Sequence, residues 1–164
     1  MSDNRDFEPT IVIDSREQMP YRFDVPTVVH ALPAGDYSVL GLETRIAIER
    51  KSLPDLLGSL TRGRDRFERE LAKARSYERF FVLCETSPDV ILEGKFEHLS
   101  QANPKAIWES ICCFSVRYPA PFLFAGDRTT AQKMVQSLLT KFAREHLRAV
   151  EDMTRAANRL RKAS

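Results

Sequence analysis

The fold is decided by residues 45–55, which read RIAIERKSLPD. In residues 45–49, Ile46 and Ile48 stand at alternate positions between the polar ends Arg45 and Glu49, and this period of two predicts a half-buried β-strand. A short helix should follow at once, because Ser52 is a favoured N-cap residue, Pro54 suits a first turn and Asp55 stands three positions after the cap. The stretch therefore predicts a strand that delivers charged side chains directly to the start of a helix.

Strands and helices alternate through the rest of the chain as well. Short runs of β-branched and aromatic residues between turn signals predict strands, and apolar residues at helical spacing predict helices. The expected strands are 11–14, 27–32, 37–40, 45–49, 80–84 and 121–125, and the expected helices are 52–60, 64–77, 103–117 and a last one capped by Thr129 or Thr130. This order is typical of an α/β fold in which helices cover a central sheet.

Length and composition limit the class of protein. A chain of 164 residues can bury one hydrophobic core without the help of disulfides or a structural metal. No apolar run approaches the roughly 20 residues that cross a bilayer, and the polar start does not resemble a secretory signal, so we expect a cytoplasmic protein without membrane contact. Cys84, Cys112 and Cys113 are expected to be reduced packing residues. We expect a polar tail at 1–9, one folded domain at 10–147 and a basic helical tail at 148–164.

Charge is distributed unevenly, although the formal net charge is only +2. Local charge rather than the sum attracts a polyanion such as a nucleic acid. Segment 62–79 carries seven basic side chains against four acidic ones, and the tail is basic again. The candidate phosphate-binding residues of the first segment are Arg62, Arg64, Arg66 and Arg69. The simpler alternative is that each stretch is only the solvated face of a helix.

Three carboxylates stand at the ends or turns of predicted strands, namely Asp14, Asp36 and Glu49. Carboxylates brought together repel one another unless a cation neutralises them. Oxygen ligands without His or Cys nearby favour Mg²⁺, with Mn²⁺ as a substitute. Such an ion can bind a phosphodiester oxygen and lower the pKa of a bound water. The expected metal ligands are Asp36 and Glu49, with Asp14 as a third candidate.

The side chain of Lys51 should point to the same side of the strand as that of Glu49, because alternate residues share a face. Lys51 would then either orient or deprotonate the attacking water, and the sequence leaves both roles open. Arg50 should point to the opposite face, where it is structural or contacts phosphate from another angle. Taken alone, this loose spacing is also typical of unrelated surface residues.

Two short motifs together resemble a known signature. Residues 35–37, GDY, and 49–55, ERKSLPD, resemble the GD…ERKxxxD signature of the XPF-type structure-specific endonucleases. The similarity extends to the first strand at 13–17, the helix and basic turn at 55–64, the core strand at 81–85 and the closing helix and strand at 107–125. It covers residues 10–147, which is nearly the whole folded part.

The resemblance implies a restriction-endonuclease-like α/β core, with a central mixed β-sheet flanked by helices, and metal-dependent cleavage of DNA at branches, flaps or junctions. The family's catalytic residues map onto Asp14, Asp36, Glu49, Arg50, Lys51 and Asp55, of which Asp14, Asp36 and Glu49 would bind the metal ion. Glu17 would lie beside the site, and Arg16 and Arg64 would face the DNA.

The sequence also departs from the family pattern. A glutamine that is common in the helix after the Gly-Arg pair is missing, and residues 68–70 read ERE instead. Cellular members usually continue into tandem helix-hairpin-helix units, whereas no glycine hairpin follows Gly126 here. Selectivity for junctions would then come from this domain, from its homodimer or from an accessory DNA-binding protein. A compact nuclease of this kind suits a phage or bacterial chain.

Two other functions stay open on the sequence alone. A non-catalytic DNA-binding or scaffold subunit of a nuclease complex would share the fold, although such subunits usually lose ligands and every core position is filled here. A restriction-type, sequence-specific endonuclease would apply the same chemistry to linear duplex. For a homodimer, the apolar stripes at 107–114 and 134–142 offer a candidate surface, although such stripes are also typical of an intramolecular core.

Overall fold

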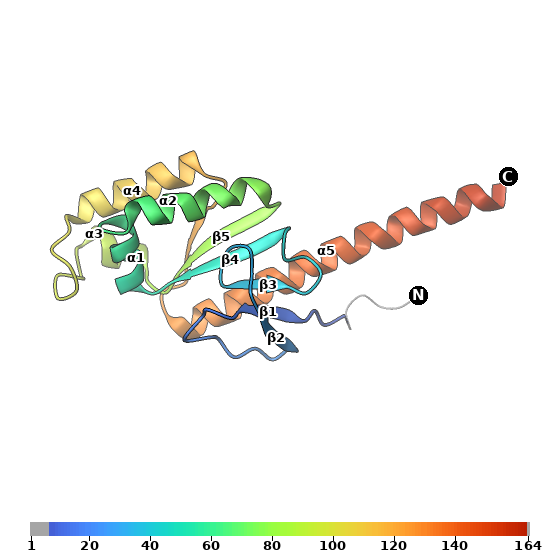
Figure 1. The fold of residues 1–164 in the computed structure, drawn as a ribbon, viewed down its shortest axis with the longest axis horizontal. Coiled ribbons are helices and arrows are strands. Elements are labelled where there is room, and N and C mark those ends of the chain that lie inside the picture. The colour runs from blue at the N-terminus through green and yellow to red at the C-terminus, as the bar shows by residue number, and fades with distance from the viewer. Residues whose placement is uncertain (1–6, 164) are drawn as a thin grey trace.

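The computed structural model describes residues 7–163 and has a mixed, six-stranded sheet at its centre (Figure 1). The strands are β1 (Ile11–Asp14), β2 (Thr27–His30), β3 (Tyr37–Val39), β4 (Ile46–Lys51), β5 (Arg79–Cys84) and β6 (Phe122–Phe124). Their order across the sheet is β2-β1-β3-β4-β5-β6. Strand β3 runs antiparallel to both of its neighbours, and all other neighbouring pairs are parallel. The expected α/β class with a central mixed sheet is confirmed.

Helices cover both faces of this sheet and create two cores. The helices are α1 (Leu53–Leu60), α2 (Arg64–Lys73), the 3₁₀ turn η1 (Ala74–Ser76), α3 (Pro88–Leu92), α4 (Pro104–Arg117) and α5 (Arg128–Ala163). Helices α1, α2 and α4 pack on one face, and α5 crosses the other (Figure 1). In β4, Ala47 belongs to the first core, whereas Ile46 and Ile48 belong to the second. The expectation of a half-buried strand is therefore wrong, because β4 is central and covered on both faces.

Local sequence signals explain where the helices begin. Ser52 caps α1 as expected, because its hydroxyl accepts a hydrogen bond from the amide of Asp55. The cap expected for α5 at Thr129 or Thr130 is wrong. The carboxylate of Asp127 accepts hydrogen bonds from the amide and the hydroxyl of Thr130 instead. An aspartate that accepts both bonds satisfies more donors than a threonine hydroxyl at that place.

Two further expectations differ from the structure. The helix predicted for 64–77 ends as α2 at Lys73, where the chain tightens into η1 before it enters β5, and the short helix α3 was not predicted. Cys84 is buried, but Cys112 and Cys113 are exposed on α4. The packing role expected for these two cysteines is wrong, because the buried face of α4 is built from the residues on the other side of the helix.

The apolar stripes considered as a dimer surface belong to the interior of the protein. Ile107 and Phe114 of α4 are buried in the first core, and Val135 and Leu139 of α5 are buried in the second. The structure therefore contains the alternative in which both stripes are part of the intramolecular core.

Gly35 lets the chain pass closely over β4 before it reaches Asp36. Its φ of +73° lies in the left-handed region. A Cβ built at this position would come within 3.1 Å of the Cβ of Ala47 and of the carbonyl oxygen of Ile48. The amide of Asp36 donates to that same carbonyl at 2.8 Å, so Gly35 fixes the position of the aspartate against the central strand.

Replacing Gly35 by Ala should lower the free energy of unfolding by about 2–3 kcal/mol, because the variant combines left-handed strain with crowding against β4. Gly41→Ala is the matched control. Gly41 has a φ of +84° but no heavy atom within 4 Å of a built Cβ, so its substitution should cost only the left-handed strain, about 1–2 kcal/mol. Urea unfolding of the three proteins measures both losses. Equal losses of unfolding free energy in the two variants would show that crowding against β4 at position 35 has no cost.

Helix α5 runs past the sheet as one continuous helix of 36 residues (Figure 1). Almost every side chain described from Arg148 onward is exposed, and we call residues 148–163 the overhang. The boundary expected between folded domain and basic tail therefore falls inside a helix. Of the polar tail expected at 1–9, residues 1–6 lie outside the described residues. Among the helices of residues 7–163, none is long and apolar enough to cross a membrane.

Candidate active site

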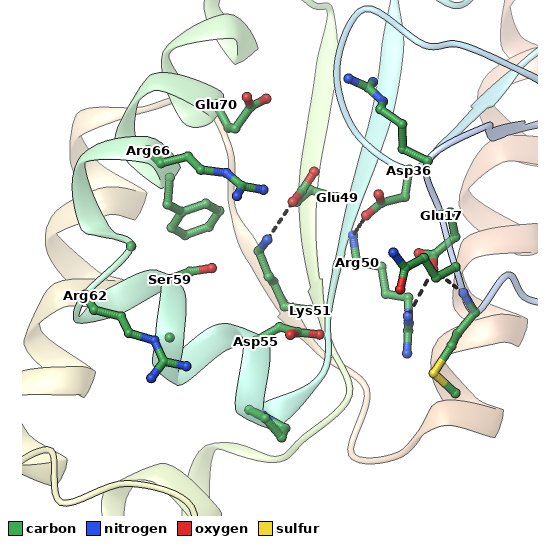
Figure 2. A pocket seen from close by; sticks show the side chains of 17 residues that line it. Glu17, Asp36, Glu49, Arg50, Lys51, Asp55, Ser59, Arg62, Arg66 and Glu70 are labelled. Atoms are coloured by element: carbon green, nitrogen blue, oxygen red, sulfur yellow. Dashed lines mark hydrogen bonds and ion pairs between the residues drawn. The ribbon is translucent and has the colours of Figure 1, made fainter.

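A cleft opens where β4 ends, between α1 and α2 on one side and the loop after β1 on the other (Figure 2). Its walls are rich in charged side chains of both signs. The predicted site residues that line it are Arg16, Glu17, Asp36, Glu49, Arg50, Lys51, Asp55, Arg62 and Arg66. The other three predicted residues, Asp14, Arg64 and Arg69, are not among the residues that line the cleft.

Strand β4 provides the central pair of the cleft. Glu49 and Lys51 point to the same side of the strand, and the ammonium nitrogen of Lys51 lies 2.6 Å from a carboxylate oxygen of Glu49 (Figure 2). This is the side-by-side placement that the period of a strand predicts. The ammonium also lies 4.9 Å from the centre of the Phe67 ring. A lysine held between a carboxylate and an aromatic ring keeps a fixed position next to the cleft.

Asp36 enters the cleft from the segment between β2 and β3. Its carboxylate accepts a hydrogen bond from the amide of Arg50 at 2.7 Å, which holds it beside the end of β4. Burial raises the pKa of Asp36 to about 8, and the negative charge of Glu49 adds to the effect. Asp36 is thus buried in the cleft next to a second carboxyl group. A hard divalent cation with oxygen ligands fits this donor set, which contains neither His nor Cys.

Asp14 has a different environment. Its carboxylate accepts hydrogen bonds from the side chain and the amide of Arg16 and from the amide of Leu32, at 2.7–2.9 Å. Burial alone would raise the pKa of Asp14, but these hydrogen bonds outweigh it and lower the pKa to about 2. The carboxylate therefore anchors the loop after β1 to the loop after β2.

The structure brings Asp36 and Glu49 together but does not bring Asp14 to them. Within residues 7–163, no group of three or more Asp, Glu, His or Cys side chains lies close enough to hold a metal ion. Two carboxylates are nevertheless sufficient for Mg²⁺, which commonly binds one or two carboxylates and keeps several waters. The pair formed by Asp36 and Glu49 meets that requirement.

Replacing Asp14 by Asn should lower the free energy of unfolding by about 1–2 kcal/mol near neutral pH, because the variant loses the charge-assisted part of these hydrogen bonds. The pKa is lower in the folded state, so the contribution is complete above the ordinary aspartate pKa of 3.8 and is lost as the pH falls to about 2. Urea unfolding of both proteins at about pH 7, 4 and 2.5 measures the difference. A difference that does not change with pH would contradict the carboxylate anchor.

A second cluster of charges lies on the opposite side of β4. Arg50 points away from Lys51, and its guanidinium donates two hydrogen bonds to the carboxylate of Glu85, at 2.7 and 3.1 Å. The same carboxylate accepts from the hydroxyl of Tyr21 at 2.6 Å and from Arg128 at 3.2 Å. Burial opposes the ionisation of Glu85, yet these donors lower its pKa. Glu85 is therefore a charged group whose partners surround it.

This cluster also ties the loop after β1 to the cleft. Arg128 donates to the carbonyl oxygens of Met19 and Pro20, at 2.7 and 3.1 Å. Arg50 lies 3.4 Å from the carboxylate of Glu17, which the sequence placed beside the site. The sequence analysis did not identify this cluster, because its members are up to 109 positions apart and only strand pairing and α5 bring them together.

The variant Glu85→Gln should lose about 2–4 kcal/mol of unfolding free energy, because Arg50 and Arg128 would keep their charges near a neutral partner. Glu78→Gln is the matched control. Glu78 is an exposed carboxylate that pairs with Arg45, and surface ion pairs contribute about 1 kcal/mol or less. Denaturant titrations of the two variants and the parent chain measure the losses. A loss for Glu85→Gln no larger than that of the control would mean that the cluster does not hold the loop.

The arginines predicted to bind DNA fall into two groups. Arg62 lines the cleft from the turn between α1 and α2, and Arg66 lines it from α2, as Figure 2 shows. Arg64 instead turns toward α4, where its guanidinium lies 4.4 Å from the centre of the Phe114 ring. Arg69 is exposed on α2 but does not line the cleft. A phosphate in the cleft would therefore meet Arg62 and Arg66 first.

Arg16 and Asp55 complete the rim of the cleft. The guanidinium of Arg16 binds Asp14, yet its side chain is 70% exposed, which leaves one face toward solvent. Asp55 lies in the first turn of α1, where its carboxylate accepts a hydrogen bond from the hydroxyl of Ser52. Its role in this structure is to complete the cap of the helix that follows the central strand.

Comparison with known proteins adds the following findings. The model of the ERCC4 domain matches residues 3–138. The DNA repair endonuclease XPF of Cricetulus griseus is 37% identical over 87 residues, which are 48% of this chain and 9% of that protein. The protein of the same name from Drosophila melanogaster is 32% identical over 109 residues, 58% of this chain and 11% of the relative. The chain thus matches about a tenth of the length of these relatives.

Solved structures of XPF from Aeropyrum pernix resemble the whole fold. One has a TM-score of 0.65 with 22% sequence identity and covers 80% of this chain and 60% of its own. The same protein in a complex with DNA has a TM-score of 0.65 with 21% identity and covers 84% of this chain and 66% of its own. At this level of identity the likeness shows the fold, and it confirms the expected restriction-endonuclease-like core.

Proposed function

Because the chain belongs to the ERCC4-domain family, the XPF-type nuclease domain that its motifs resemble, we propose that it is a metal-dependent DNA endonuclease. The observation that carries the proposal is the meeting of Asp36, Glu49 and Lys51 in one cleft. Its relatives are named DNA repair endonucleases, and one similar structure is a complex with DNA. We propose branched, flap or junction DNA as the substrate.

The proposed cofactor is Mg²⁺, with Mn²⁺ as a substitute, and Asp36 and Glu49 would hold it. When bound, such an ion neutralises the two carboxylates, activates a water and stabilises the charge that develops on phosphorus. Asp14 stays a prediction as a third ligand. It would first have to give up its hydrogen bonds to Arg16 and to the amide of Leu32.

The residues of the chain have separate tasks in this proposal. Arg62 and Arg66 bind phosphates at the mouth of the cleft and position the backbone of the DNA. Lys51 is paired with Glu49 in this structure, and its ammonium becomes available once that carboxylate turns to a cation. As an ammonium it would orient the attacking water or stabilise charge on phosphorus, and only as a neutral amine would it take a proton from that water. Arg50 stays bound to the carboxylates on the far side of β4 and holds the strand end in place.

Asp36→Asn and Lys51→Ala should each reduce cleavage by about 100-fold or more, because each removes a group that acts on the reacting phosphate or its metal. The assay compares end-labelled linear, flap, fork and four-way DNA, with Mg²⁺ and with EDTA. Asp65→Asn is the control, since Asp65 is exposed on α2 and does not line the cleft. Its activity should equal that of the parent chain.

Each other outcome of this assay has a defined meaning. Tight binding without cleavage by the parent chain would favour a non-catalytic DNA-binding or scaffold subunit. Cleavage of linear duplex at one sequence, with branched DNA left intact, would favour a restriction-type enzyme. Full activity of Asp36→Asn or Lys51→Ala would overturn the proposed site.

The double variant Arg62→Ala, Arg66→Ala should bind all DNA substrates more weakly and should lower the salt slope of log K by about 1–2, since each phosphate contact releases nearly one counterion. Arg69→Ala is the matched control on the same helix, because Arg69 is exposed but does not line the cleft. Fluorescence anisotropy at several salt concentrations, with EDTA to prevent cleavage, measures both slopes. An unaltered slope in the double variant would remove these two arginines from the DNA interface.

A homodimer and an accessory DNA-binding protein are also proposed as partners. Both follow from the resemblance to the family. The stripes at 107–114 and 134–142 cannot provide the surface, because their main apolar residues pack inside the protein. A second copy of the chain therefore needs another place to bind.

A further inference from the structure

An exposed apolar side chain lines the cleft from the loop after β1. Met19 is 61% exposed, and among the exposed large apolar side chains of residues 7–163 it alone lines the cleft. Phe67, which also lines the cleft, is buried, and its ring lies beside the ammonium of Lys51. A single exposed apolar side chain is common on a protein surface, but one in the wall of a charged cleft is placed to contact an apolar part of the molecule that binds there.

The backbone that carries Met19 is held in place on both sides. The amide of Met19 donates to the carboxylate of Glu17 at 2.7 Å, and its carbonyl oxygen accepts from Arg128 at 2.7 Å. Pro20 follows, whose ring fixes one backbone dihedral angle and whose carbonyl oxygen also accepts from Arg128, at 3.1 Å. The loop therefore presents the side chain of Met19 without having to become ordered on binding, which lowers the entropic cost of a contact.

The two walls of the cleft differ in the charge that they offer to a ligand. Glu17 lies across from Arg62 and Arg66, with the end of β4 between them (Figure 2). Within residues 7–163, neither of these two arginines forms an ion pair. Arg16 on the loop wall, in contrast, is already bound to Asp14. The phosphates of a bound DNA strand are therefore expected along the wall with the two free arginines, which leaves the bases of that strand toward the loop after β1.

A base offers its apolar face only where the stack of bases is interrupted. In a continuous duplex, the faces of each base are covered by its neighbours, and only the base edges are accessible in the grooves. At a fork, flap or branch the stack ends, so a base face becomes accessible in the last pair of an arm or in the first unpaired nucleotide. Apolar side chains, methionine included, insert at opened base steps, and a thioether sulfur contacts aromatic rings favourably.

We propose that Met19 packs on a base face that a junction leaves uncovered, and that this contact makes the cleft prefer branched DNA to linear duplex. The inference rests on the proposed DNA nuclease function and names the feature of the substrate that the site recognises. The contact reads the interruption of the stack and not the base sequence, because every base has such a face. Met19 is then a specificity-determining residue without a part in the chemistry, and selectivity for junctions comes at least partly from this domain.

Fluorescence anisotropy with EDTA measures binding to a fork and to a linear duplex of the same sequence, without cleavage. The parent chain should prefer the fork. Met19→Ala should weaken binding to the fork by about fivefold, the size expected for a contact between a thioether and a ring, and should leave binding to the linear duplex unchanged. Met19→Leu should keep most of the preference, because it retains an apolar side chain of similar volume. Met153→Ala is the matched control, since Met153 is 65% exposed on α5 and does not line the cleft.

Removal of the base tests the contact from the side of the DNA. Forks with an abasic nucleotide in the last pair of an arm, or at the first unpaired position, are compared with the intact fork. The parent chain should bind one of them about fivefold more weakly, whereas Met19→Ala should bind that fork as tightly as the intact one, because its half of the contact is already missing. The position that shows this coupling identifies the base that Met19 contacts.

The results separate this inference from the proposed function. Coupling in a chain that does not cleave would support the base contact and overturn the nuclease. A parent chain that cleaves DNA but binds the fork and the linear duplex equally well would overturn the base contact alone. The same conclusion would follow if Met19→Ala kept the fork preference, weakened binding to both substrates equally, or showed losses that simply add to those of the abasic forks. A chain that binds no DNA would overturn both proposals.

Discussion

Strand β4 is buried on both faces and ends in three consecutive charged residues, and the arrangement of the site follows from that constraint. All six residues of β4 pair in parallel with β5, so the strand cannot shift to move its charges into solvent. A charged group that loses water without gaining partners is costly, so Glu49, Arg50 and Lys51 must each find one nearby. The period of the strand sends Arg50 to one side and the other two to the opposite side. One strand end therefore creates two different electrostatic environments.

These two environments differ in how their carboxyl groups are stabilised. Around Arg50 the partners are sufficient, because Glu85 accepts from three side chains and its pKa is lowered. On the cleft side, burial raises the pKa of Asp36 to about 8, and the neighbouring charge of Glu49 adds to the effect. The cluster around Arg50 stabilises the strand end, whereas two neighbouring carboxyl groups in a cleft are suited to share a divalent cation. Perturbed carboxylates in a cleft are typical of functional sites, and structural pairs such as Arg50 with Glu85 supply the rigidity that such sites need.

The sequence predicted the side of the sheet to which a side chain points better than it predicted that side chain's hydrogen-bond and ion-pair partners. The strand predicted at 45–49 correctly indicated that Glu49 and Lys51 share a side, since side-chain direction depends only on the strand period. The partner of Asp14 could not be read in this way, because the amide of Leu32 meets its carboxylate only when β1 and β2 pair. Glu85 stands directly after a predicted buried strand, which was an available signal, but its converging donors come from three separate segments. The central position of β4, covered on both sides, likewise follows from sheet order rather than from local pattern.

Helix α5 links the site to the rest of the fold. It contacts the site at its start, packs on the sheet along its middle and extends beyond the sheet at its end. Arg128 in its first turn binds Glu85 and the loop that forms one wall of the cleft. The buried face between contacts the second core, so the helix cannot rotate without disrupting the sheet. The position of Arg128, and with it that wall of the cleft, is therefore fixed by the packing of the helix against the second core.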